Sequence, residues 1–361
     1  MSETHGPMGP PIYPAQVLPE PPASWAPRRR SVWSALGWIF LLLILLSSLV
    51  LNLGLFLVLL VRSAEREEGI VKRHFSHTKG AANQVVILSV EGAMVGGEEF
   101  FKKQIDLLRK DERVKALVLR INSPGGLVSV ADFMLHQLKK LAQERDIPIV
   151  VSMGGMAASG GYYIAMAAGE RSDCLFAEPT TFTGSIGVII PHYDLSQLLE
   201  RWGVKEDSIA SHPLKGMGSI TRPMTEEERR IFQGLVDEAF GRFKEVVKQG
   251  RAKFRAHPDA LDKLATGQIF TAQQALEHGL VDKIGYLEDA IERAIELAGL
   301  APDQVEVIRY EREPTLADLL LGADASQPPL DLAALLDSTS PRAYYLCTRL
   351  PPLVSSYPSQ R

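Results

Sequence analysis

A long run without a single charged residue, from Val32 to Val61, constrains this chain more than any other feature of its sequence. As a helix, such a run is long enough to cross a hydrocarbon core of roughly 30 Å. A cleaved signal peptide would instead have an apolar region of about 7–15 residues that ends in small residues. The sequence therefore predicts a transmembrane helix over residues 32–61.

The charges that flank this run predict which end of the helix lies in the cytoplasm. Arg28, Arg29 and Arg30 precede the run, whereas acidic and basic residues are mixed directly after it, between Arg62 and Glu68. Positive charges gather on the cytoplasmic side of membrane spans. We therefore expect the N-terminus in the cytoplasm and the bulk of the chain outside it. The proline-rich residues 1–31 predict a disordered cytoplasmic tail.

The composition limits the size and the class of the remaining chain. With 361 residues, of which 46% are hydrophobic, it can bury the core of one main domain. A net charge of -4 gives no basic footprint for nucleic acid, so we expect no nucleic-acid partner. The two cysteines, Cys174 and Cys347, lie far apart and have no metal-site spacing, so the sequence indicates neither a disulfide framework nor a zinc site.

Strand and helix patterns alternate after residues 62–82, which we interpret as a polar linker. Residues 85–90, 114–121 and 147–152 are apolar, β-branched runs of strand length, and helical patterns cover residues 98–110 and 127–145. A further helix is expected directly after Ser159. Such alternation predicts an α/β fold in which a parallel sheet is joined by right-handed crossover helices.

The second half of the chain is predicted to be mainly helical. We expect short strands at residues 174–177 and 185–190, and helices at residues 194–202, 225–254, 271–278 and 287–297. The folded domain is therefore predicted over residues 83–312. Residues 313–361 contain proline- and serine-rich patches around a short leucine-rich segment, and we expect a loose C-terminal tail.

The first candidate for chemistry is the sequence Asn-Ser-Pro-Gly-Gly at residues 122–126, which follows a predicted buried strand. Ligand sites of parallel sheets lie at the carboxyl ends of the strands. The pair Gly125 and Gly126 can present backbone N–H groups to a developing negative charge, because no side chain blocks the approach. An ordinary strand-to-helix turn explains the same residues.

The second candidate is Ser159, which lies between a buried strand and an apolar helix. Glycine and alanine surround it in the sequence Met-Ala-Ala-Ser-Gly-Gly-Tyr-Tyr at residues 156–163, so a substrate carbonyl can approach its hydroxyl. A helix N-terminus at this point would help to stabilise an oxyanion. The competing interpretation is that Ser159 is a helix N-cap, which is the commonest role of serine at such a position.

A nucleophilic serine needs a base, and the histidines show no triad spacing. A lysine can serve when burial lowers its pKa from about 10.4 toward roughly 7–8. Lys215 stands out because apolar residues and glycines surround it in the sequence Ser-His-Pro-Leu-Lys-Gly-Met-Gly-Ser at residues 211–219. For any single lysine, however, a solvated surface position is the commoner situation.

Three segments together resemble the signal peptide peptidase A family of serine–lysine proteases, peptidase family S49. They are Ile-Asn-Ser-Pro-Gly-Gly at residues 121–126, the serine motif at residues 156–163, and Thr-Gly-Ser-Ile-Gly-Val at residues 183–188. A fourth segment, residues 267–282, is similar to its counterpart in the wider Clp-protease and crotonase fold group. The resemblance covers about residues 83–300 and implies a Clp-protease/crotonase-like fold.

Each role that the family implies falls on a matching residue of this chain. The resemblance implies Ser159 as the nucleophile, Lys215 as its general base, and Ser185 as the residue that positions the lysine amine. It also implies that a backbone N–H of the pair Gly125–Gly126, chiefly that of Gly126, contributes to the oxyanion hole. No metal and no organic cofactor is implied.

The lysine loop departs from the family pattern. The family's lysine is usually followed by an acidic residue and then by a Gly-Ser-Pro stretch, whereas this chain has Gly216 after the lysine and Ile220 in place of the proline. Lys205 is the alternative base, although Glu206 and Asp207 beside it favour a solvated position.

The resemblance also implies a place in the cell, substrates and an assembly. It indicates a single-pass protein of the bacterial inner membrane whose catalytic domain lies outside the cytoplasm and degrades remnant signal peptides and other hydrophobic peptides. A ring- or dome-shaped homo-oligomer is expected, in which neighbouring protomers complete each site. Two alternatives stay open: a crotonase-like acyl-CoA enzyme, and a membrane scaffold without catalytic activity.

Overall fold

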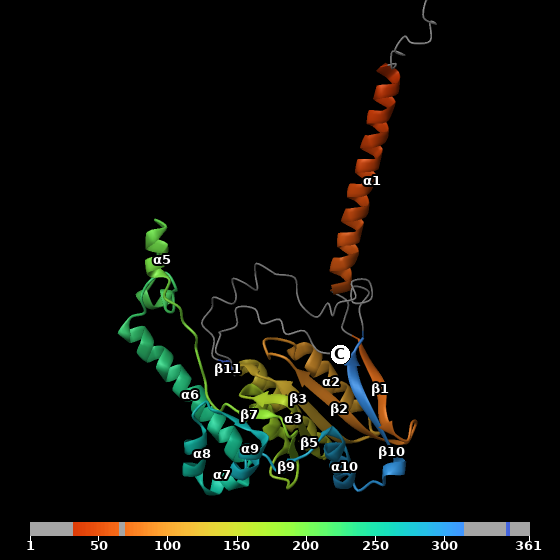
Figure 1. Cartoon of the computed structure of the whole chain (residues 1–361), viewed down its shortest axis with the longest axis vertical. Helices are drawn as coiled ribbons and strands as arrows, with labels where there is room; N and C mark the ends of the chain where they lie inside the picture. Colours follow the sequence, from red (N-terminus) through yellow and green to blue (C-terminus); the bar gives the residue numbers. More distant parts are fainter. Residues whose placement is uncertain (1–31, 65–68, 314–343, 347–361) are drawn as a thin grey trace, which may run out of the picture. The chain divides into compact units, whose positions relative to one another are not determined.

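The computed structural model describes residues 32–64, 69–313 and 344–346, and the chain divides into two units between Arg66 and Glu67. The proline-rich tail and most of the C-terminal tail lie outside the described residues. The described residues of the first unit form one helix, α1 (Val32–Ala64), drawn in red in Figure 1. Its segment Leu36–Phe56 is long and apolar enough to cross a membrane, with a mean hydropathy of 2.6 and no buried residues. This agrees with the helix predicted over residues 32–61.

The second unit is built on a sheet of nine strands. Seven of them form the order β1-β10-β2-β3-β5-β6-β9, and β7 (Phe182–Gly184) and β8 (Ile269–Thr271) continue the sheet beyond β5. The bounds of the seven are β1 (Ile70–His77), β10 (Val305–Arg312), β2 (Asn83–Glu91), β3 (Val114–Ser123), β5 (Ile149–Ala158), β6 (Leu175–Ala177) and β9 (Lys283–Ile284). From β10 to β9 each neighbouring pair is parallel, and β1 is added antiparallel at the edge. The predicted parallel sheet is confirmed.

The central strands are apolar because both faces of the sheet are covered. Residues 85–88 of β2 and residues 116–119 of β3 are completely buried. Helices α2 (Glu98–Lys110) and α3 (Val128–Arg145) pack on each other, and α10 (Leu287–Leu297) packs on β2, β3, β5 and β6. These three helices agree with the helical patterns of the sequence to within one residue at either end.

Six further helices lie in the part of the chain between β5 and α10. They are α4 (Gly160–Ala165), α5 (Ser196–Arg201), α6 (Glu226–Gly250), α7 (Ala252–Ala256), α8 (Pro258–Leu264) and α9 (Ala272–His278). Thr225 and Glu228 form a capping box at the start of α6, because each side chain accepts a hydrogen bond from the backbone N–H of the other. The sequence predicts a single helix over residues 225–254. In the structure α6 ends at Gly250 and is followed by the short α7.

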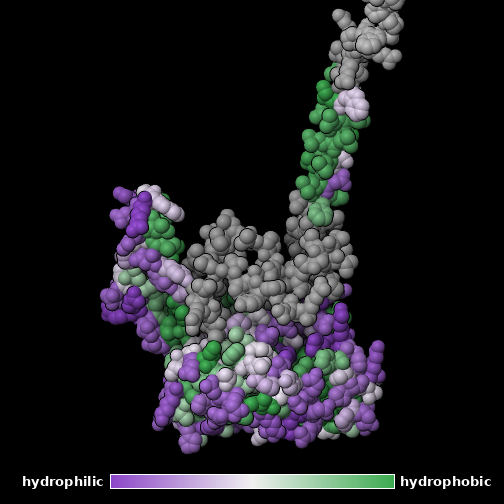
Figure 2. All heavy atoms as spheres, viewed as in Figure 1, coloured by the Kyte–Doolittle hydropathy of each residue, from purple (hydrophilic) through white to green (hydrophobic). Residues whose placement is uncertain are grey.

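One segment of the second unit projects away from the sheet. It comprises α5, the 3₁₀ turn η3 (Pro213–Gly216) and the first part of α6, and we refer to residues 191–235 as the arm (Figure 1). Large apolar side chains are exposed on it or at its base, and apolar surface is visible there in Figure 2. They include Ile189, Leu198, Trp202, Val204, Ile209 and Leu235.

Two sequence predictions are corrected by the sheet. Residues 62–82, predicted to be a linker, contain β1, whose residues 72–75 are exposed because the strand lies at the sheet edge. The strand predicted at residues 185–190 is absent, and β7 instead covers Phe182–Gly184. Ser185 has a φ of 51°, which is incompatible with a continuing strand. The prediction also missed β10, which lies between β1 and β2.

The carboxylate of Asp282 joins the end of the sheet to the helical region. One of its oxygens accepts the N–H groups of Cys174 and Leu175, at 2.9 and 3.0 Å, and the other lies 2.7 Å from the guanidinium of Arg251. Both side chains of this ion pair are largely buried.

Replacement of Asp282 by alanine should lower the free energy of unfolding by about 3–5 kcal/mol, because it leaves a buried guanidinium without its negative partner and two N–H groups without their acceptor. The matched control is Asp262→Ala, which breaks an exposed pair with Lys244 and should cost about 0–1 kcal/mol. Thermal unfolding of the full-length protein in detergent would measure both effects. Equal shifts in Tm would contradict the structural role of Asp282.

Candidate active site

The junction between β5 and α4 holds Ser159 in an unusual conformation. Its φ of 55° and ψ of −113° lie outside the regions that non-glycine residues ordinarily occupy, and its backbone N–H donates to the carbonyl of Gly184 at 2.8 Å. Although Ser159 occupies the N-cap position of α4, its side chain makes no capping hydrogen bond. Strain of this kind is concentrated at functional sites. The N-cap interpretation therefore does not account for the residue.

Ser185 lies beside Ser159 because two parallel strands end together. Ala158 of β5 and Gly184 of β7 are register partners, so the next residue of each strand falls at the same edge of the sheet. Ser185 is also largely buried, has a positive φ, and donates its backbone N–H to Gln268 at 2.7 Å. Thr183 fixes the pairing further, since its hydroxyl donates to the carbonyl of Ala157 at 2.6 Å. The second and third motifs of the sequence thus meet at one point.

The glycine pair approaches the same point from β4 (Gly125–Leu127). Gly125 has a φ of 97°, and a Cβ atom placed on it would lie 2.6 Å from the backbone nitrogen of Gly160. A Cβ placed on Gly160 would lie 3.1 Å from the Cα of Gly125 and 3.2 Å from the nitrogen of Gly126. The two backbones therefore touch without intervening side chains. The N–H groups of Gly126 and Gly160 are candidates for an oxyanion hole around the hydroxyl of Ser159.

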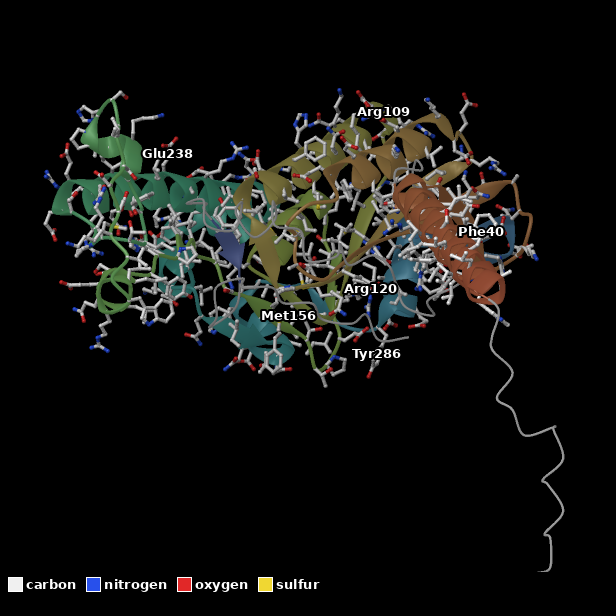
Figure 3. The ribbon with its side chains drawn as sticks, turned by 90° about the horizontal axis from the view of Figure 1, so that it is seen from above. Phe40, Arg109, Arg120, Met156, Glu238 and Tyr286 are labelled. Atoms are coloured by element: carbon white, nitrogen blue, oxygen red, sulfur yellow. The ribbon has the colours of Figure 1, made fainter. Side chains whose placement is uncertain are left out.

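The predicted base does not join these residues within one chain. Lys215 lies in η3 on the arm, and its side chain is exposed. Lys205, the alternative base, is also exposed on the arm. Figure 3 shows Glu238 on α6, the helix that leads to the arm, and Met156 on β5, three residues before Ser159, in the central part of the unit. The structure thus brings together Ser159, Ser185 and the glycine pair, and leaves the role of Lys215 a prediction.

An ion pair that the motif analysis missed holds the lysine loop. The guanidinium of Arg222 donates to the carbonyl of Gly216 at 3.0 Å and to both oxygens of Glu228 at 2.5 and 3.0 Å. Glu228 is 2% exposed and also accepts the N–H of Thr225. These bonds tie the turn that carries Lys215 to the first turn of α6. The Thr-x-x-Glu pattern at residues 225–228 is the signal by which the sequence could have indicated this helix start.

The charges around Glu228 stabilise its carboxylate form. The hydrogen bond from Arg222, opposed by partial desolvation and supported by the N–H of Thr225, lowers the pKa of Glu228 to about 2.

Among the described residues, no three His, Cys, Asp or Glu side chains gather as a metal site would require. The described residues around Ser159 offer a hydroxyl and backbone N–H groups for chemistry.

Comparison with known proteins shows the family to which the chain is similar. Residues 141–301 match the sequence profile of peptidase family S49. A Synechocystis protein named as a putative protease is 38% identical over 75% of this chain and 95% of its own length. A protein of Enterococcus faecium named as a putative signal peptide peptidase SppA is 37% identical over 66% of this chain and 70% of its own length. Protease 4 of Salmonella typhi is 35% identical over 66% of this chain, and the match spans 38% of that longer protein.

The stabilisation supplied by Glu228 should depend on pH. Because its pKa in the folded protein is lower than the ordinary value of 4.5, the contribution is complete above about pH 4.5 and is lost as the pH falls toward 2. At pH 7, Glu228→Gln should lower the free energy of unfolding by about 1–2 kcal/mol, allowing for the partial exposure of Arg222. Tm measurements from pH 7 to pH 3 should show the two proteins converging, and a constant difference would contradict the assignment.

Proposed function

The chain belongs to peptidase family S49, in the branch of signal peptide peptidase A, and we propose that it is a serine endopeptidase whose nucleophile is Ser159. The observation that carries this proposal is the strained, buried Ser159, whose chain neighbour Gly160 closely approaches the backbone of the glycine pair. In the proposed mechanism this hydroxyl attacks a peptide carbonyl bound in the site, and the adjacent N–H groups are preorganised for the negative charge of the tetrahedral intermediate.

The proposed reaction proceeds in two steps. Ser159 attacks the peptide carbonyl carbon while the neutral amine of Lys215 accepts the hydroxyl proton. The oxyanion is stabilised by the N–H groups of Gly126 and Gly160, and the protonated lysine donates its proton to the leaving amine as the peptide C–N bond breaks. Water, deprotonated by the same lysine, then hydrolyses the acyl-enzyme. In this scheme Ser185 orients the lysine amine.

The exposed position of Lys215 supports a site completed by a neighbouring copy of the chain. The arm extends from the sheet and carries exposed apolar side chains such as Trp202 and Ile209, which an adjacent protomer would cover. A lysine inserted into a neighbour's site would be desolvated, which favours the neutral amine that a base requires. We therefore propose a homo-oligomer with active sites close to the interfaces between protomers.

The apolar helix α1 supports a location at the membrane. A single span, with arginines before it, would anchor the chain with its N-terminus in the cytoplasm and its catalytic domain outside. A peptidase held there acts on peptides that reside in or leave the membrane. The proposed substrates are therefore remnant signal peptides and other hydrophobic peptides.

Replacement of either Ser159 or Lys215 by alanine should reduce hydrolysis of a fluorogenic peptide with apolar residues before the cleaved bond by at least about 10³-fold, because each removes one member of the dyad. The measurement compares full-length protein in detergent with both variants after their assembly has been checked. Activity should also decline as the pH is lowered, because an ammonium group cannot accept the proton of the serine. Full activity of Lys215→Ala would transfer the role of base to another residue.

The shared-site proposal predicts complementation between inactive variants. Mixed oligomers of Ser159→Ala and Lys215→Ala protomers contain some interfaces in which an intact serine faces an intact lysine. Co-expression should therefore restore part of the activity, up to about one quarter in a random mixture, whereas oligomers of either variant alone stay inactive. No recovery in a verified mixed oligomer would indicate that serine and lysine come from the same chain.

A further inference from the structure

Strand β5 carries extra residues shortly before the chain reaches Ser159. Its register with β3 is regular up to Met153, and the pairing resumes at Ala157. A single residue of β3, Asn122, therefore lies opposite three residues of β5, residues 154–156, which we refer to as the bulge. A β-bulge changes the direction of the strand that follows it, and bulges are common next to active sites.

The bulge is also the point at which β5 changes its neighbour. Residues 151–153 pair with β6, whereas residues 156–158 pair with β7. Ser159 follows this second pairing directly, and its N–H donates to the carbonyl of Gly184 of β7. The direction in which the chain leaves the bulge therefore sets the position of Ser159 relative to Ser185, the residue after Gly184.

The guanidinium of Arg120 on β3 lies against the bulge. It donates to the hydroxyl of Ser152 at 2.9 Å and to the carboxylate of Glu178, the residue directly after β6, at 2.6 Å. A Cβ atom placed on Gly154 would lie 3.0 Å from its Nη2 atom, so any side chain at that position would crowd the guanidinium. The arginine thus joins β3, β5 and the end of β6 at the bulge.

Two further hydrogen bonds hold the bulge from either side. On the side of β3, the side-chain carbonyl of Asn122 accepts the N–H of Met156 at 3.2 Å. On the side of β7, the buried hydroxyl of Thr181 donates to the carbonyl of Gly154 at 2.6 Å. Side chains therefore hold β5 at the point where its regular ladder with β3 is interrupted.

Stability alone does not explain an ion pair at this position. The side chains of Arg120 and Glu178 are largely buried. Because the removal of charges from water costs free energy, such a pair is often no more stabilising than two apolar side chains of similar volume. An arginine, however, presents several N–H groups in a fixed planar geometry and can hold two partners at once. Arg120 is therefore suited to fixing two strands and a turn in one arrangement.

We infer that Arg120, through its pair with Glu178, is a positioning residue that holds the bulge of β5 in the shape that places Ser159 beside the glycine pair. The inference rests on the proposed function, in which Ser159 is the nucleophile, and adds a determinant of its position. Arg120 acts through the backbone of residues 154–158. A displacement of the reacting atoms by about 1 Å can lower a rate by about 10²-fold.

Hydrogen exchange tests this inference without requiring catalysis. The variant is Arg120→Met in the full-length protein in detergent, and mass spectrometry follows the amides of residues 154–160. Exchange in this segment should become at least about tenfold faster, because the N–H groups of Met156 and Ser159 lose the arrangement that holds their acceptors. Unchanged exchange in this segment would overturn the inference.

Two controls separate the position of the bulge from the stability of the fold. Arg109→Met breaks the ion pairs of α2 with Asp106 and Glu144, and it should lower Tm without changing exchange in the bulge. Arg120→Met combined with Glu178→Met leaves neither charge unpaired, so its Tm should stay close to that of the wild type while exchange in the bulge remains fast. Exchange that returns to the wild-type rate together with Tm would overturn the inference and make the pair a stabiliser of the fold.

Hydrolysis of a fluorogenic peptide then shows whether the position of the bulge affects the reaction. Arg120→Met and the double variant should both lower kcat by about 10- to 100-fold and leave KM within about twofold of the wild type, because the geometry of attack changes and peptide binding does not. Arg109→Met should keep the wild-type kcat. Fast exchange with an unchanged kcat would overturn the inference. Absence of hydrolysis by the wild type would contradict the proposed peptidase function instead, while exchange would still decide whether Arg120 holds the bulge before Ser159.

Discussion

The close approach of two backbones that carry no side chains between them is the constraint on which this site depends. Gly125 of β4 approaches Gly160 so closely that a side chain on Gly125 would collide with the nitrogen of Gly160, and Ser159 precedes Gly160 directly. The parallel pairing of Ala158 with Gly184 adds Ser185 to the same edge. Without this contact, the hydroxyl of the serine and the two candidate N–H groups would not lie close enough together for one carbonyl group to reach all three.

The strain at Ser159 is sustained by the structure around it. Its N–H bond to Gly184, the buried helix α4 behind it and the Thr183 bond to β5 together fix a φ that serine rarely adopts. The arm contrasts with this fixed region. Its lysine turn is held by the charges of Arg222 and Glu228, while its outer apolar residues are exposed. A rigid serine site and a lysine on a projecting arm agree with the proposal that the active site is completed between subunits.

Much of this architecture follows from local patterns, and the errors have physical causes. The buried strands β2, β3 and β5 and the helices α2, α3 and α10 were predictable because apolar periodicity reports burial directly. The sequence predicts a linker where β1 lies because an edge strand exposes polar side chains, and it does not indicate β10, which pairs with β1. The strand predicted at residues 185–190 failed because Gly184 and Ser185 both adopt positive φ angles, which residue composition alone does not reveal.

The sequence by itself determined the apolar span, the α/β class and the identity of the candidate nucleophile, because each is encoded by contiguous residues. Only the tertiary structure decided which segments meet at Ser159. It placed Ser185 and the glycine pair beside Ser159, left Lys215 exposed on the arm, and put Tyr345 on the edge of β4. These outcomes depend on pairing between residues far apart in the chain, and a strand edge accepts any extended backbone, so no local pattern specifies its partner.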